Sequence, residues 1–235
     1  DADNRLPPPK NYTWPPYLEH QRDRIDAEVA AEVQAIAGLT PDVNAWMPTK
    51  TWATTRAGAL AQLDCFIEHH LAGFGPYEDA IAADNWALHH SLLSPYLNNG
   101  LLHAEEVIRA VLGAYRAGAP IGSVEAFVRQ VIGWREYING MYWFLGEDYR
   151  NHNQLGGNRD LLPLFTDPTK TQMNCVKSIV TDLKERSWVH HIPRLMVLSN
   201  LALITGTNPQ QFLDWMRREF IDATDWVMVP NVIGM

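Results

Sequence analysis

Apolar residues recur every three or four positions along most of this 235-residue chain, which is the spacing of helices that bury one face. In residues 22–37, for example, the apolar positions include Ile25, Val29, Val33 and Ile36. No segment alternates apolar and polar residues as a half-buried strand does. The pattern therefore predicts an all-α chain with one helical domain over residues 22–235.

The limits of the helices follow from capping residues, glycines and prolines. A hydroxyl or amide side chain caps a first turn, and proline fits the first helical position. Thr54 or Thr55, Ser94-Pro95, Ser123 and Asn208-Pro209 are such starts. We predict helices over 22–37 with Gly38 as the cap, from Thr55 to near Gly73, from Ser94, and over 104–116, 123–145, 174–186, 189–204 and 209–221. Residues 41–55 and 146–170 are predicted loops.

Composition narrows the class of protein. Hydrophobic residues make up 46% of the chain, and no apolar run reaches the roughly 18 residues of a membrane span. A formal net charge of −8 argues against non-specific coating of nucleic acid, although it leaves room for a local basic rim. Two cysteines are too few for a disulfide framework, so we expect a cytoplasmic protein. Both ends of the chain look cut, and no signal peptide is recognisable.

Common catalytic motifs are missing from the sequence. The chain has no GxGxxG after a strand, no Walker loop, no GxSxG elbow, no HExxH and no CxxC pair. Three His-His pairs begin at His69, His89 and His190. Adjacent residues of a helix point about 100° apart, so one such pair rarely holds one ion. A histidine metal site is therefore disfavoured.

The third pair lies near an arginine, in a segment suited to proton transfer. His190 and His191 stand at the head of a predicted buried helix, with Arg194 three residues on. A neutral imidazole in an apolar pocket can change protonation near pH 7 and deliver a proton. A histidine on an apolar helix is more often a hydrogen-bonded core residue. The residues alone leave both interpretations open.

Three further segments carry residues suited to a ligand. Ser91 and Ser94 precede a helix N-terminus, which favours phosphate, although Ser94 is equally suited to capping. Residues 129–137 set two arginines, a glutamine and two aromatic rings around Gly133, which suits either a conjugated ring or a salt-bridged surface. Asp222 and Asp225 can grip donor groups of a heterocycle or pair with an arginine.

Together these segments resemble the photolyase/cryptochrome superfamily, in particular its bacterial iron–sulfur branch, the prokaryotic (6-4) photolyases. The matching segments are Ser91–Leu97, Arg129–Tyr137, His190–Val197 and Ile221–Met235, with weaker agreement at Phe74–Ala80 and Met173–Val176. Each segment alone is unspecific, but four in this order on an all-α background are specific. The resemblance covers essentially the whole chain.

The resemblance implies the helical catalytic domain that holds FAD in a bent form. Residues 1–21 are then a linker from an amino-terminal α/β antenna domain that is absent here, and the helical domain is truncated at its carboxyl end. Gly133 and Gly140, inside the longest predicted helix, suit close packing or the approach of a ligand.

The resemblance also implies a set of site residues. Ser91, Ser94 and Tyr77 lie near the diphosphate, Asp222 and Asp225 face the isoalloxazine, and Asn231 approaches its reducible nitrogen. Arg129, Gln130 and Arg135 line the flavin side of the cavity, and Trp134 and Arg194 its substrate side. Trp188, Trp215 and Trp226 are either parts of an electron-hopping chain or core residues.

The activity implied is light-driven repair of (6-4) pyrimidine photoproducts by electron transfer from reduced FAD. His191 is the expected proton donor and His190 its support, acting on a dinucleotide flipped out of UV-damaged DNA. Two alternatives stay open, a cryptochrome-like photoreceptor without repair and a flavin-free helical interaction module. A monomer is expected.

Some positions depart from the family pattern. The iron–sulfur branch carries a four-cysteine 4Fe-4S cluster, and only Cys175 lies in a matching segment. Because one thiolate cannot hold such a cluster, its other ligands are expected outside this sequence. Cys65 is expected to be a small buried hydrophobe. Leu195 stands where eukaryotic (6-4) enzymes have a second histidine, and Asp225 where glutamate is common. The antenna pigment is left open.

Overall fold

The computed structural model describes residues 4–22, 24–36 and 50–234. Its α-helices are α1 (Arg24–Ile36), α2 (Arg56–Cys65), α3 (Leu71–Tyr77), α4 (Ser94–Asn99), α5 (Ala104–Arg116), α6 (Ile121–Leu145), α7 (Asn174–Arg186), α8 (Asn200–Ile204), α9 (Pro209–Glu219) and α10 (Asp225–Ile233). Two π-helical segments, η3 (Phe66–His70) and η7 (Ile192–Ser199), join α2 to α3 and lead into α8. Within the described residues there is no strand, so the all-α prediction is confirmed.

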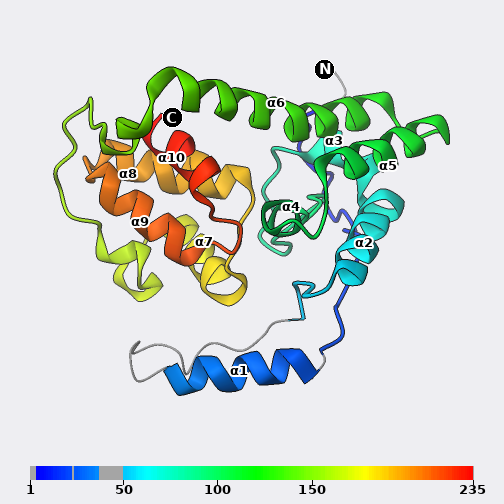
Figure 1. Cartoon of the computed structure of the whole chain (residues 1–235), viewed down its shortest axis with the longest axis horizontal. Coiled ribbons are helices and arrows are strands. Elements are labelled where there is room, and N and C mark those ends of the chain that lie inside the picture. The colour runs from blue at the N-terminus through cyan, green and yellow to red at the C-terminus, as the bar shows by residue number, and fades with distance from the viewer. Residues whose placement is uncertain (1–3, 23, 37–49, 235) are drawn as a thin grey trace.

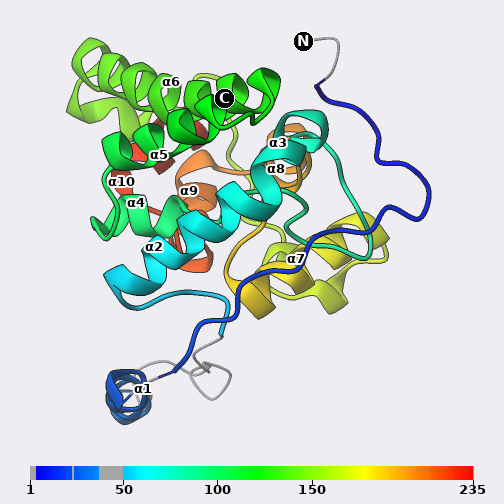
Figure 2. The same ribbon diagram turned by 90° about the vertical axis from the view of Figure 1, so that its right-hand side faces the viewer.

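The helices form two groups, and each group has its own apolar core. The first core includes Phe66, Phe74 and Phe127 and lies among α2 to α5 and the first half of α6. The second core includes Phe212 and Trp215 and lies among α7 to α10. Helix α6 runs across both groups (Figure 1), touching α3 and α5 near one end and α10 near the other. Helix α1 lies apart from both groups in two views (Figures 1 and 2).

Two of the predicted helix caps are confirmed and two are wrong. Thr55 accepts a hydrogen bond from the Gly58 amide, and Asn208 accepts from the two amides that follow Pro209. Ser94 is instead the first residue of α4, and its hydroxyl is used elsewhere. Ser123 lies one turn inside α6, where its hydroxyl donates to Ala72 and accepts from the Gly75 amide, so it joins α6 to α3. The predicted cap Gly38 lies outside the described residues.

Several helix limits differ from the sequence-based prediction. The helix expected to stop near Gly73 continues through η3 and α3 to Tyr77. Gly73 lies inside α3 against the ring of His89, which an added Cβ would overlap. The predicted loop 146–170 contains three short 3-10 turns: η4 (Glu147–Asn151), η5 (Pro163–Phe165) and η6 (Pro168–Lys170). Helix α10 was not predicted at all. An added Cβ at Gly133 or Gly140 meets no described atom within 4 Å, so neither glycine serves close packing in this part of the chain.

The described residues were also compared with the requirements for a membrane-spanning helix. None of their helices combines the length and the apolar character that a bilayer crossing requires.

Candidate functional site: a cavity between two cores

A cavity of about 560 Å³ is lined by residues of both helix groups. Phe74, Phe127 and Trp188 contribute from the first core, Asp222 from the segment leading into α10, and Val227 from α10 itself. A second cavity of about 220 Å³ shares eight lining residues with the first, so the two adjoin. Together they have the size of a small-molecule or cofactor site.

The two cavities bring together most of the site residues expected from the sequence. The larger one is lined by Ser91, Ser94, Gln130, Trp134, Arg135, Trp188, His191, Arg194, Asp222 and Trp226. The smaller one adds His190 and Asn231. The serine pair, the two adjacent histidines and the asparagine near the carboxyl end therefore meet in one region, although they come from three distant parts of the chain.

A buried ion pair fixes the centre of this region. Asp222 and Arg194 have side chains only 6% and 14% exposed, and the Arg194 Nη2 lies 3.0 Å from Asp222 Oδ1. The Ser94 hydroxyl donates to Asp222 Oδ2 at 2.7 Å, and Asn98 donates to the backbone carbonyl of Asp222 at 2.8 Å. The Arg194 guanidinium also lies over the ring of Phe220, 4.2 Å from its centre. The pair ties α4 to η7 and to the loop before α10, and it leaves a cation and an anion beside the cavity.

Three histidines, His90, His190 and His191, line the two cavities, and their environments differ. The rings of His90 and His190 stack with centres 4.6 Å apart. Burial lowers the pKa of His90 to about 3 and that of His190 to about 2, so both are neutral at pH 7. His191 has an exposed edge at the larger cavity, and desolvation still lowers its pKa. Asp79, on the same cavity wall, raises it in opposition, which favours a protonated His191.

Aromatic and cationic side chains of α6 and α10 form another wall. Trp134 Nε1 donates to Gln130 at 2.7 Å, and both residues line the larger cavity. Arg135 donates to the carbonyl of Val131 and lies over the ring of Trp226, 5.5 Å from its centre. Burial lowers the pKa of Arg135. This wall offers flat apolar faces and donor groups to a conjugated ring.

Comparisons of sequence and of structure both match this chain to photolyases. The chain is 41% identical over 236 aligned residues, all of its length, to the (6-4) photolyase of Agrobacterium fabrum. It also matches a crystal structure of a bacterial class III photolyase from Agrobacterium tumefaciens, with a TM-score of 0.65 and 25% identity over 77% of this chain. A shorter match, 38% identical over 31% of this chain and 57% of the relative, is an uncharacterized protein of Acanthamoeba polyphaga mimivirus. No family model matches the chain.

The chain belongs to the photolyase family. It spans 46% of the Agrobacterium fabrum relative and 38% of the class III photolyase chain. The helical fold is therefore that of the photolyase catalytic domain, and flavin binding is what relatives of this family imply.

The residues of this photolyase cavity fit a flavin. Ser91 and Ser94 offer hydroxyls at one wall, and the Arg194–Asp222 pair offers a buried donor and acceptor beside them. Asn231, whose Nδ2 donates to Val227 at 2.7 Å, stands at the smaller cavity. These lining residues suit a ligand that has an anionic group at one end and a polar aromatic ring at the other.

Five of the expected site residues do not line either cavity of the photolyase domain: Tyr77, Arg129, Trp215, Asp225 and Cys175. Tyr77 packs instead against Tyr12 and Trp14 of the amino-terminal segment and against His89. Arg129 forms an ion pair with Glu125 on the exposed face of α6. Trp215 is 2% exposed and stacks on Phe212, which is the core role considered as its alternative.

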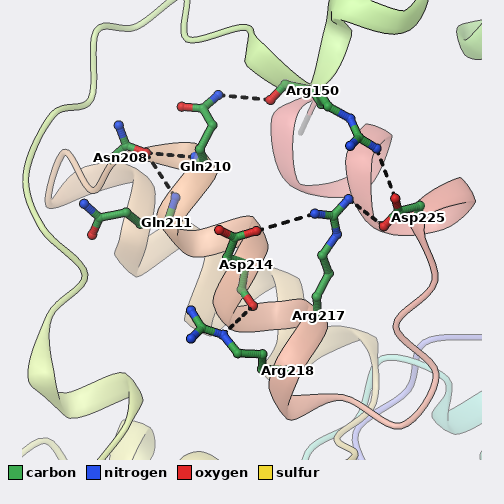
Figure 3. A network of polar contacts seen from close by, with 8 residues as sticks. All are labelled: Arg150, Asn208, Gln210, Gln211, Asp214, Arg217, Arg218 and Asp225. Atoms are coloured by element: carbon green, nitrogen blue, oxygen red, sulfur yellow. Dashed lines mark hydrogen bonds and ion pairs between the residues drawn. The ribbon is translucent and has the colours of Figure 1, made fainter.

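Asp225 belongs to a surface network rather than to the cavity (Figure 3). It lies between two arginines, 3.0 Å from Arg150 Nη2 and 2.5 Å from Arg217 Nη2, and its side chain is 60% exposed. Gln210 donates to the backbone carbonyl of Arg150, and Arg217 also reaches Asp214. The network holds the turn η4 against α9 and α10. The resemblance implied that both aspartates face the flavin, but of the two only Asp222 lines the cavities.

Neither cysteine is part of a preformed metal centre. Cys175 is exposed in the first turn of α7. Cys65 is half-buried rather than fully buried, and burial raises the pKa of its thiol. Among the residues that the structure describes, no three His, Cys, Asp or Glu side chains are grouped as metal ligands. These residues do not by themselves fit a 4Fe-4S cluster.

Phe74, Asp79, His90 and Met196 are among the residues that line the larger cavity without having been expected as site residues. His90 directly precedes Ser91, so its position next to the serine pair was a usable signal. Met196 lies in the His190–Val197 segment and was passed over as an apolar helix position. Phe74 lies in α3 and Asp79 just after it, and α3 packs against α6, a contact between distant segments that the local pattern does not predict.

Proposed function

We propose that this chain is the flavin-binding part of a light-driven DNA-repair lyase that acts on (6-4) pyrimidine photoproducts. One observation carries the proposal: a cavity that unites His191, Ser94 and the Arg194–Asp222 pair, in a chain 41% identical along its whole length to a (6-4) photolyase. When bound, FAD supplies a light-driven electron to the lesion and takes it back at the end of the reaction.

The residues of the cavity have separable tasks. Ser91 and the donor groups beside it bind the anionic part of the flavin, and Trp134 and Trp226 offer flat faces to rings in the cavity. The Arg194–Asp222 pair places a fixed cation and anion beside the path of the electron between flavin and lesion, and its burial excludes water. The lesion enters as a dinucleotide turned out of UV-damaged duplex.

His191 holds and delivers the proton. A donor must be protonated before transfer, and desolvation by the surrounding protein works against this while Asp79 works for it. The stacked, neutral His90 and His190 pack behind it without competing for the proton. Because the pKa of His191 is lowered from the usual 6.5 of histidine, we expect the repair rate to fall with rising pH already below pH 6.5.

The decisive experiment follows the lesion. The flavin-loaded, reduced chain is illuminated with an oligonucleotide that carries a (6-4) photoproduct, and loss of the near-ultraviolet band of the lesion is recorded. We expect His191→Ala to lower the rate at least a hundredfold with flavin absorbance retained. The control is His69→Ala, at an exposed histidine outside both cavities.

Each other outcome has a defined meaning. Retained turnover in His191→Ala removes the proton-donor role. Flavin binding without any repair, under conditions that repair a control, replaces the proposal by a cryptochrome-like photoreceptor. A colourless chain that takes up no added FAD supports the flavin-free interaction module. The 4Fe-4S cluster with Cys175 as one ligand, the antenna linker at residues 1–21 and an electron path through Trp188 and Trp226 remain parts of the proposal.

A further inference from the structure

The helix that follows His191 is wound more loosely than an α-helix. Residues Ile192–Ser199 form a π-helix, and the Asn200 amide bonds to the carbonyl of Leu195, five residues back. Pro193 lies in the first turn, where its missing amide costs no hydrogen bond. Eight residues is long for a π-helix, and such segments are frequent at functional sites.

The loose winding changes which side chains share a face with His191. In an α-helix, residues five apart point about 140° away from each other. In a π-helix the wider turn, with its i to i+5 hydrogen bond, brings residues five apart back onto the same face. His191 and Met196 are five apart, and both line the larger cavity, whereas Leu195 lines only the smaller one. The π-helix thus places Met196 beside the proposed proton donor.

Met196 has no packing role that explains its position. It belongs to neither apolar core, and 56% of its surface is exposed. Its neighbours Leu195 and Leu198 on the same helix are buried. Because Met196 is both exposed and part of the cavity lining, its side chain is free to pack against an apolar part of a ligand in the cavity. Methionine suits a flat aromatic partner because its thioether is flexible and polarisable.

We infer that Met196 is a specificity-determining residue that packs on a base of the flipped lesion while His191 serves as proton donor. The inference rests on the proposed function of the same cavity. A base of the substrate fits better than the flavin, because Met196 is at the open edge while Asp222 and Asn231 are buried farther in. In this role the π-helix presents two residues to the same cavity, His191 for proton transfer and Met196 for contact with the base.

The test measures affinity separately from turnover. The flavin-loaded chain is titrated, in the dark, against a labelled duplex with a (6-4) photoproduct and against the undamaged duplex, and fluorescence anisotropy gives both dissociation constants. Met196→Ala removes three heavy atoms from a contact, and we expect about fivefold to tenfold weaker binding of the damaged duplex only. Met196→Leu keeps the apolar volume, and its affinity is expected to stay within about twofold of the wild type.

A matched control comes from the same helical run. Ile204, at the end of α8, is 73% exposed and lines neither cavity, so Ile204→Ala is expected to leave both dissociation constants unchanged. Circular dichroism melting and flavin absorbance of every variant show whether fold and cofactor site persist. If the alanine variant does not fold, Met196→Gln keeps the length of the side chain but makes its end polar, and we expect it to weaken binding of the damaged duplex in the same way.

The outcomes separate this inference from the proposed function. If the wild type prefers damaged duplex and Met196→Ala binds it equally well, the inference is wrong and the proposed function stands. Loss of flavin absorbance in the folded Met196→Ala variant also overturns it, because the residue then acts on the flavin. If the wild type does not distinguish the two duplexes, the proposed function fails, and Met196 has no base to contact.

Discussion

Removing the carboxylate of Asp222 should destabilise the chain far more than removing that of Asp225, although both aspartates form ion pairs with arginines. Asp222→Ala leaves the Arg194 guanidinium, 14% exposed, without its anion, and it also removes the acceptor of the Ser94 hydroxyl. Breaking a buried pair by deleting one partner costs about 3–5 kcal/mol. Asp225 is 60% exposed and screened by water, so Asp225→Ala should cost less than about 1 kcal/mol.

Urea unfolding followed by circular dichroism measures this difference. With a slope of about 2–3 kcal/mol per molar urea, the Asp222→Ala midpoint should fall by about 1–2 M and that of Asp225→Ala by less than about 0.5 M. The double variant Asp222→Ala/Arg194→Met should recover part of the loss, since it leaves no unpaired buried charge. Equal midpoint shifts for the two single variants would refute the distinction between a buried and a surface ion pair.

Two further expectations concern buried histidines and glycines. Because burial lowers the pKa values of His90 and His190 below the 6.5 of an unfolded histidine, the free energy of unfolding should fall as the pH drops from 6.5 toward 3. Urea midpoints between pH 7 and 4 check this, and His90→Phe should flatten the slope. Gly73→Ala should cost about 1–3 kcal/mol, since the new Cβ overlaps His89, whereas Gly133→Ala should add up to about 1 kcal/mol of stability. If both alanine variants shift the midpoint in the same direction, the packing argument is wrong.

Most of the helices could be predicted from local sequence patterns. The 3.6-residue period and the caps at Thr55 and Asn208 depend on neighbours in the sequence, so most helices could be placed from the sequence alone. Helix α10 was missed because Pro230 is typical of a helix end, yet here it lies inside the helix. The π-helix after His191 was missed because the apolar pattern of eight residues does not distinguish an i+4 from an i+5 hydrogen bond.

The candidate site was predictable where a segment keeps its own geometry and failed where distant segments compete. Asp222 and Asp225 were both expected to face the isoalloxazine, but the helix begins only at Asp225, and only Asp222 lines the cavities. Tyr77 was expected at the flavin, but the amino-terminal segment brings Tyr12 and Trp14 to it. No local spacing rule contains such contacts between residues more than sixty positions apart.

The division of the domain into two apolar cores has a consequence for how it melts. Each core has its own set of buried apolar residues, and the two are joined by helix α6, by the stacked rings of His90 and His190, and by polar contacts such as that of Asn98 with Asp222. We expect each core to unfold as a unit of its own. Calorimetry of the bare chain should therefore resolve two heat-absorption peaks. A molecule seated between the halves touches both at once, so saturating amounts of it should merge the peaks into one and move that peak upward. The ligand would then hold the two halves of the domain together as well as take part in its chemistry.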